Sequence, residues 1–234
     1  MLPTDTLDPL EMQRAHKVLL VINLASIVGF GLLFLVRLNY EFIIYVGVIV
    51  FFLCLIGISI NKVDYTLGSL VGLTVWSALH LAGGGVMIGG GRLYNVMLIR
   101  LSETYPVWRY DQLVHMWGFG ASTLVVFSLL TRLLRRPVRN PVALGIVLVM
   151  AGLGLGAFNE IVEFFVTICV PQSGVGGYMN TALDLCADLI GAILGLLYIR
   201  FRYLGKENMQ QAHGSGAGRR DRDGSETSHA QSRV

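Results

Sequence analysis

The sequence predicts an all-α fold, a polytopic membrane helix bundle of about six transmembrane helices with both termini in the cytoplasm. Hydrophobic residues make up 54% of its 234 residues and charged residues only 14%, whereas a soluble domain carries about 25% charged residues. The apolar residues are concentrated in long stretches, and roughly 20 of them in a helix span a hydrocarbon core of about 30 Å. Lys and Arg lie mostly on one side of these stretches, which indicates the orientation of the chain.

Six segments are long and apolar enough to cross a bilayer. In chain order they are Val18–Val36, Phe42–Ile60, Thr66–Ile88, Leu113–Leu130, Val142–Ile168 and Thr181–Phe201. The first is expected to be an anchor and not a cleaved signal, since its leader carries Asp5, Asp8 and Glu11 and its apolar run is long. Together the spans are expected to form one membrane domain, residues 18–204, after a cytoplasmic N-terminal segment at residues 1–17.

The segments between and after the spans are polar. The longest loop outside the bilayer is expected at residues 89–110, between the third and fourth spans. Its LYNVMLIRL run predicts a short interfacial helix, with Tyr94, Tyr105 and Trp108 at the level of the lipid headgroups. Residues 205–234 are rich in Gly, Ser, Arg and Gln and have no apolar periodicity, so they predict a disordered cytoplasmic tail.

Basic residues predict the side of the membrane on which each loop lies. With the N-terminus inside, 14 of the 18 Lys and Arg residues lie on the cytoplasmic side and four lie outside. The densest group, Arg132–Arg139, is in the short loop after the fourth span. The positive-inside rule explains this group as a topology signal, which we favour over nucleic-acid binding. We therefore expect a multi-pass protein of the inner or plasma membrane, embedded in the lipid bilayer and without a nucleic-acid partner.

Seven ionisable residues inside or at the edges of the spans mark a candidate site. They are His80 in the third span, Asp111 and His115 in the fourth, Glu160 and Glu163 in the fifth, and Asp184 and Asp188 in the sixth. A central Asp costs about 2.5–3.5 kcal/mol on insertion scales, so such side chains are expected to face the bundle interior or a water-filled cavity. With the predicted orientation and a rise of about 1.5 Å per residue, all seven lie in the outer third of the bilayer.

Helical spacing places small residues on the same faces as these ionisable residues. The stripes are Asp111, His115, Gly118 and Ser122 in the fourth span, Gly152, Gly156, Glu160 and Glu163 in the fifth, and Asp184, Asp188, Gly191 and Gly195 in the sixth. Small residues at i and i+4 allow membrane helices to approach closely. We therefore expect the glycines to draw the fifth and sixth spans together. Asn159 and Asn180 lie beside acidic positions, where they either orient the carboxylates or end a helix.

Three interpretations of this polar layer are open at the level of sequence. The first is a buried hydrogen-bonded network that only fixes helix register. The second is an enzyme-like site for an amphiphilic envelope substrate, in which the seven residues perform acid–base catalysis or a divalent metal ion binds. Its expected metal ligands are His80, His115, Glu160 and Asp184. The third is a carrier whose carboxylates take up protons or cations, although the inner halves of the spans lack matching polar residues. The substrate and the oligomeric state do not follow from the sequence.

Four sequence patterns resemble a known family in their order and spacing. They are His80 with Gly83 and Gly84, YDQLVHMWGFG at Tyr110–Gly120, FNEIVEFF at Phe158–Phe165, and DLCADLIGA at Asp184–Ala192. Over roughly residues 66–200 the chain is similar to the YjdF-like family of polytopic inner-membrane proteins. A looser similarity to the VanZ-like proteins rests on the final element, Asp184, Asp188 and Gly191–Ala192, and it implies cell-envelope chemistry by analogy. Asn180 stands where the family pattern has an acidic residue.

Overall fold

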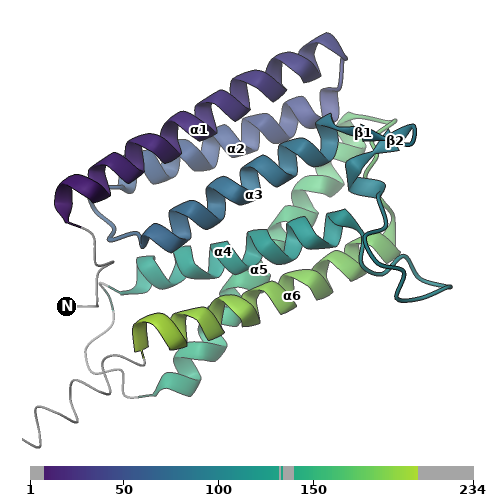
Figure 1. The fold of residues 1–234 in the computed structure, drawn as a ribbon. Coiled ribbons are helices and arrows are strands. Elements are labelled where there is room, and N and C mark those ends of the chain that lie inside the picture. Colours follow the sequence, from purple (N-terminus) through teal and green to yellow (C-terminus); the bar gives the residue numbers. More distant parts are fainter. Residues whose placement is uncertain (1–7, 132, 134–139, 205–234) are drawn as a thin grey trace, which may run out of the picture.

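The computed structural model describes residues 8–131, 133 and 140–204, which form a bundle of six long helices (Figure 1). In chain order the elements are α1 (Pro9–Val36), α2 (Tyr40–Ser59), α3 (Leu67–Gly85), β1 (Met87–Ile88), β2 (Gly91–Arg92), η1 (Leu93–Asn95), α4 (Tyr110–Leu130), α5 (Pro141–Cys169), α6 (Tyr178–Ile199) and η2 (Arg200–Leu204). Each of the six long helices can cross a membrane by its length and composition. The predicted all-α membrane bundle is therefore confirmed. The predicted tail, residues 205–234, and most of the basic loop lie outside the described residues.

Local sequence signals explain where two of the longest helices begin. Asp8 accepts a hydrogen bond from the backbone N–H of Glu11 at 2.8 Å, and Pro9 starts α1. This helix therefore begins inside the segment predicted to precede the first span. Asn140 and Pro141 start α5 in the same way, with the Asn140 side chain accepting from a backbone N–H. These caps satisfy donors that the first turn of a helix leaves without an intrahelical partner.

The chain after α3 turns back in a short hairpin. The helix ends at Gly85, before the predicted end of the third span at Ile88, and β1 pairs antiparallel with β2. Gly89 and Gly90 at the turn have φ values of +57° and +83°, which glycine adopts without strain. The prediction of an interfacial helix in the LYNVMLIRL run is wrong. Only the single turn of η1 forms there, because the loop folds back over α3 and α4.

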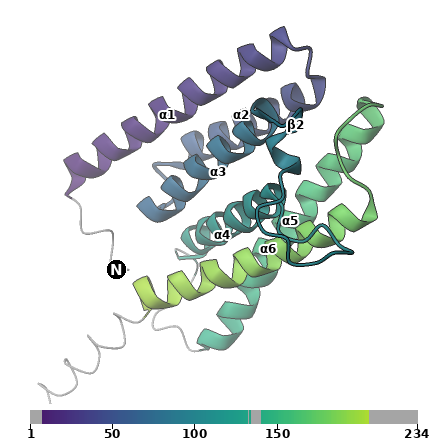
Figure 2. The same cartoon turned by 45° about the vertical axis from the view of Figure 1, so that its right-hand side comes forward.

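The helices alternate in direction, so the bundle has two distinct ends. The hairpin end carries β1, β2 and the turns that join α1 to α2 and α5 to α6 (Figure 1). The terminal end carries the start of α1 and the end of α6 (Figures 1 and 2). At the centre, α4 contacts α3, α5 and α6, whereas α1 lies at the edge with most of its residues facing outward. The first turns of α4 and α6 therefore meet the last turns of α3 and α5 at the hairpin end.

Glycines bring α6 into close contact with α4. Gly191 lies against the backbone carbonyl of Met116, and Gly195 lies against the backbone of the same helix one turn further along. In α5, Gly156 packs against the carboxylate of Asp188. The expectation that glycines draw α5 and α6 together is therefore correct for the α5 glycine. It is wrong for the α6 glycines, because the face of α6 that carries them packs against α4.

We expect Gly191→Ala to destabilise the bundle by about 1–3 kcal/mol, the usual cost of overpacking a close contact. A Cβ at this position would overlap the carbonyl of Met116. Gly154 on the outward side of α5 is the matched control, since a Cβ there meets no atom within 4 Å. Alanine in a helix is otherwise favoured over glycine by roughly 0.5–1 kcal/mol. Unfolding midpoints in detergent measure both variants, and equal midpoints would contradict the close packing of α4 and α6.

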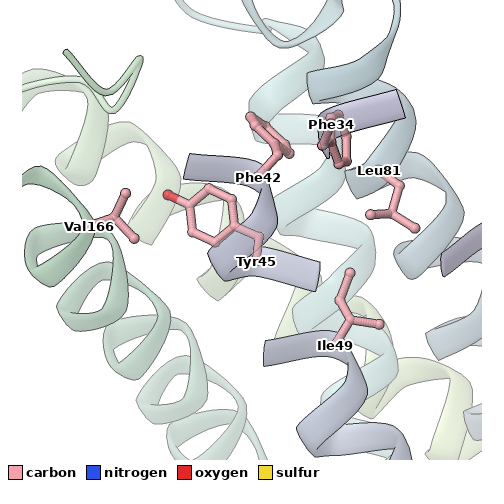
Figure 3. Close-up of a cluster of buried hydrophobic side chains, with 6 residues drawn as sticks. All are labelled: Phe34, Phe42, Tyr45, Ile49, Leu81 and Val166. Carbon is pink, nitrogen blue, oxygen red and sulfur yellow. The ribbon is translucent and has the colours of Figure 1, made fainter. Parts of the chain in front are cut away.

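A cluster of buried hydrophobic side chains from α1, α2, α3 and α5 supports the hairpin end (Figure 3). Its members are Phe34, Phe42, Tyr45, Ile49, Leu81 and Val166. Gly84 of α3 makes room for the ring of Phe42, which a Cβ would overlap. The hydroxyl of Tyr45 points from α2 toward the helix that carries Val166 (Figure 3). Two of the aromatic members also surround His80, so this cluster holds one wall of the site described next.

Candidate metal centre

Three helices place ionisable side chains around one imidazole at the hairpin end. The residues are Asp111 and His115 from α4, Glu160 and Glu163 from α5, and Asp184 and Asp188 from α6. Spacings of three or four residues put the members of each pair on one face of their helix. The structure thus brings together six of the seven residues that the sequence assigns to the polar layer.

Asp188 orients the ring of His115. The Nδ1 atom of His115 lies 3.0 Å from Asp188 Oδ1 and 3.8 Å from Glu160 Oε1. Its Nε2 atom lies 3.8 Å from Asp111 Oδ1 and 3.8 Å from Glu163 Oε1. When Nδ1–H donates to Asp188, Nε2 carries the free lone pair. Metal-binding histidines are usually held in this way, with a carboxylate on the nitrogen that does not bind the metal.

Two asparagines orient the carboxylates around the imidazole. Asn180 Nδ2 donates to Asp111 Oδ2 at 3.2 Å and also to Asp184 Oδ2. Asn159 Nδ2 donates to Glu163 Oε1 at 2.9 Å. The expectation that these asparagines orient acidic residues is confirmed by the contacts. Because Asn180 holds one oxygen of Asp111 and one of Asp184, the other oxygen of each remains available as a ligand.

The site is buried and strongly acidic. Asp184 and Asp188 are fully buried, and the side chains of His115 and Glu160 are only 6% and 8% exposed. One oxygen each of Glu160, Asp184 and Asp188 is buried without a hydrogen-bond partner in the described part of the chain. Among the described residues, no Lys or Arg lies within 4.0 Å of a carboxylate of this site. Buried carboxylates are costly unless a cation or a proton compensates them.

Two overlapping groups of side chains have the spacing of metal ligands. One is Asp111, His115 and Asp184, and the other is His115, Glu160 and Asp188; in each, one ligand atom per residue lies within 4.8 Å of the others. Donors about 2.0–2.1 Å from one ion lie at most about 4.2 Å apart. The 3.8 Å between His115 Nε2 and Asp111 Oδ1 is within this limit. One nitrogen and several oxygen donors suit Zn²⁺, Mn²⁺ or Fe²⁺, so the residues fit a divalent ion.

His80, the seventh predicted residue, belongs to neither group. Four aromatic rings surround it at centroid distances of 5.2–5.9 Å, namely those of Phe42, Tyr45, Trp76 and Tyr94. Tyr94 Oη lies 2.5 Å from His80 Nδ1. His80 is thus separated from the other three predicted metal ligands, because aromatic side chains of α2, α3 and η1 enclose its ring. Those three are His115, Glu160 and Asp184.

Sequence comparison matches residues 16–204 to a family described as a predicted membrane protein, DUF2238. The chain belongs to the DUF2238 family. This is the YjdF family, in agreement with the resemblance of the sequence patterns. The VanZ-like similarity remains a prediction. Comparisons with curated proteins and with solved structures each find no match. Membership in this family shows that the chain is a membrane protein. The roles of its polar residues follow only from the geometry of the site.

In this DUF2238 protein, a cavity is lined by Asp111 and Glu163, whose carboxylates each lie 3.8 Å from Nε2 of His115. Its lining residues include Asp111, Glu163, Asn180, His80 and Tyr94. The first three belong to the acidic site, and the last two form the hydrogen-bonded pair described above. Glu160 and Asp188, which lie on the Nδ1 side, are not among the lining residues. The cavity therefore connects Asp111 and Glu163 of the acidic site with His80, whereas His115 itself is not among its lining residues.

The sequence prediction missed an ion pair beside this cavity. Glu41 in the first turn of α2 is buried, and its Oε2 accepts from Arg92 Nη1 at 2.7 Å and from the N–H of Gly174 at 2.8 Å. The guanidinium of Arg92 also lies over the ring of Phe42, 5.4 Å from its centroid. The available signal was an acidic residue directly before an apolar span, with an arginine in the outer loop. Both residues fell outside the predicted polar layer.

Proposed function

We propose that this DUF2238 protein binds a divalent metal ion at His115 Nε2, with Asp111 and Asp184 as further ligands, and acts on an amphiphilic substrate. The orientation of His115 carries the proposal. Asp188 holds Nδ1, which leaves Nε2 facing carboxylates that have no Lys or Arg partner among the described residues. A purely structural network is expected to pair its buried oxygens with hydrogen-bond donors, and three of these oxygens have none in the described chain.

The surrounding side chains are suited to support such an ion. A divalent ion would act as a Lewis acid on an oxygen atom of the substrate. Asp188 sets the tautomer of the histidine, and Asn180 holds Asp111 and Asp184 in place. Outer partners of this kind are worth roughly 10–100-fold in metal affinity. Glu163 lies near Nε2 and lines the cavity, so it is placed to exchange a proton with a bound substrate.

Tyr94 and His80 form a hydrogen-bonded pair in the same cavity. Tyr94 lies in η1, outside the spans, and burial raises the pKa of its hydroxyl well above the ordinary value. The hydroxyl therefore stays protonated and donates to His80 Nδ1. This bond favours a neutral imidazole with its proton on Nε2. The role of His80 that we propose is thus hydrogen bonding in the cavity, and not metal binding.

The position of the cavity favours an amphiphilic substrate. It lies at the hairpin end of a membrane-spanning bundle and is lined both by polar side chains and by the rings of Phe42 and Tyr45. A polar headgroup can enter it while the hydrocarbon chain remains in the bilayer. The distribution of Lys and Arg favours an orientation in which this end faces the outer side of the inner or plasma membrane. We therefore propose envelope lipids as the substrate class.

Contacts in the terminal half of the bundle favour this site over a proton- or cation-coupled carrier. Four buried hydroxyls there each donate to a carbonyl of their own helix, from Ser69, Thr74, Thr123 and Ser128. The buried acidic residues and histidines of the described chain, by contrast, lie at the hairpin end. They are Glu41, His80, His115, Asp184 and Asp188. The described spans thus offer no buried acidic residue or histidine between the site and the terminal end.

Elemental analysis of the wild-type protein tests the proposal. The chain is purified in mild detergent, exposed separately to Zn²⁺ and to Mn²⁺, and desalted. We expect at least one tightly bound ion per chain, and we expect EDTA to remove it. A chain that elutes as a folded species with full helicity, yet retains neither metal, would contradict the proposal.

A further inference from the structure

When ionised, the carboxylates at the hairpin end would carry more charge than one divalent ion compensates. There are five of them around His115, namely Asp111, Glu160, Glu163, Asp184 and Asp188. No Lys or Arg of the described chain pairs with any of them. Inside a membrane-spanning bundle, uncompensated charge is costly and marks a functional group by default. A single ion at Nε2 leaves most of this charge in place.

Glu160 and Asp188 form a separate acidic pair on the Nδ1 side of His115. Glu160 Oε1 and Asp188 Oδ2 are buried, and neither has a hydrogen-bond partner among the described residues. The two side chains are 8% and 0% exposed. Together with His115 they make up the second group that has metal-ligand spacing. Gly156 leaves the space that the Asp188 carboxylate occupies, since a Cβ there would overlap it.

We propose that this pair holds a second divalent cation, bound by Glu160 Oε1, Asp188 Oδ2 and water. Asp188 Oδ1 keeps its hydrogen bond to His115, so one carboxylate links the two ion sites. Because the donors are oxygens, this second site takes a hard ion, Mg²⁺ or Mn²⁺. The inference rests on the proposed ion at Nε2 and extends it to a two-ion centre.

The two sites differ in access. Asp111 and Glu163 line the cavity, whereas Glu160 and Asp188 do not. The second ion is therefore enclosed by α4, α5 and α6 and does not meet the substrate. Its role is to compensate the charge of Asp188, which in turn orients His115 toward the first ion. EDTA should consequently remove the second ion more slowly than the first.

Counting Mn²⁺ ions per chain in wild type and in single variants tests the second site. After loading with Mn²⁺ alone and desalting, we expect two ions in the wild type and one each in Glu160→Gln and Asp111→Asn. Glu103→Gln is the matched control with two ions, since Glu103 is 84% exposed in the loop of the hairpin end. Elution volume and helicity show whether each variant is folded.

The possible results separate this inference from the proposed function. One ion in both the wild type and Glu160→Gln overturns the second site and leaves the first intact. No ion in the wild type overturns both. Loss of both ions in folded Glu160→Gln overturns the division into two sites. Should Glu160→Gln fail to fold, Glu160→Asp retracts the carboxylate by one methylene. That variant is expected to weaken one ion and spare the other, and unchanged affinity for both overturns the second site.

Discussion

Replacing His115 with alanine is expected to release the metal ion at the Nε2 site. Outer partners of a metal-bound histidine are worth roughly 10–100-fold in affinity, so loss of the ligand itself should cost more than about 100-fold. The remaining carboxylates would lose their nitrogen neighbour. In the wild type, His115 Nε2 lies 3.8 Å from Asp111 Oδ1 and 3.8 Å from Glu163 Oε1. Titration of the purified variant with Zn²⁺, followed by elemental analysis, measures this loss.

Two other histidines provide the controls for this experiment. His16 is half-buried in the first part of α1, at the terminal end, so His16→Ala removes an imidazole far from the site and should leave the metal content unchanged. His80→Ala should also retain the ion, because His80 is in neither group of candidate ligands. Loss of the ion from His80→Ala would restore the ligand set predicted from sequence. Equal metal content in His115→Ala and wild type would exclude His115 as a ligand.

The common level of the site residues along the bundle was predictable from sequence for a physical reason. A hydrocarbon core of about 30 Å forces each span to a similar length, and alternating directions then fix which end of each helix shares a level. These constraints alone predict that three of the residues meet at the hairpin end. They are Asp111 at the start of α4, Glu163 near the end of α5 and Asp184 near the start of α6. The six predicted spans agree with the helices for the same reason.

The rotation of each helix and its lateral neighbours were not predictable in this way. The spacing of Gly191 and Gly195 shows that they share a face, but it does not show whether that face meets α4 or α5. The structure assigns it to α4 through contacts with Met116 and Gly120. His80 lies at the hairpin end like the other six residues, but three of the four rings around it come from α2 and η1, which are distant in sequence. Side-chain packing between helices decides these contacts, and the hydropathy pattern of a sequence does not predict that packing.

The connecting segments were the least predictable part. The hairpin depends on two glycines with positive φ, and the loop after it is held by contacts with α3 and α4 and not by an apolar period of its own. Glu41 and Arg92 lie 51 residues apart and meet only because the hairpin folds over the start of α2. Their ion pair closes one side of the cavity, so a wall of the cavity arises from segments that the sequence describes only as loop.

Replacing Arg92 with alanine is expected to lower the free energy of unfolding by about 3–5 kcal/mol, the usual effect of removing one partner from a buried ion pair. Glu41 is only 5% exposed, and Arg92 is its basic partner in the described chain, at 2.7 Å. The same oxygen of Glu41 accepts from Gly174, so the pair joins α2, β2 and the turn between α5 and α6. Without the guanidinium, the carboxylate of Glu41 remains buried with a single backbone donor, the N–H of Gly174.

Arg100→Ala is the control for this effect, because the Arg100–Glu103 pair is 3.4 Å apart with side chains that are 69% and 84% exposed. Such surface pairs contribute about 0–1 kcal/mol. Adding Glu41→Gln to Arg92→Ala should recover much of the loss, since a neutral amide removes the unpaired charge and still accepts from the N–H of Gly174. Unfolding midpoints of the four proteins in detergent distinguish these cases. If Arg92→Ala shifted the midpoint no more than Arg100→Ala, the hairpin would be held by its aromatic contacts. The cavity would then keep its shape without the ion pair.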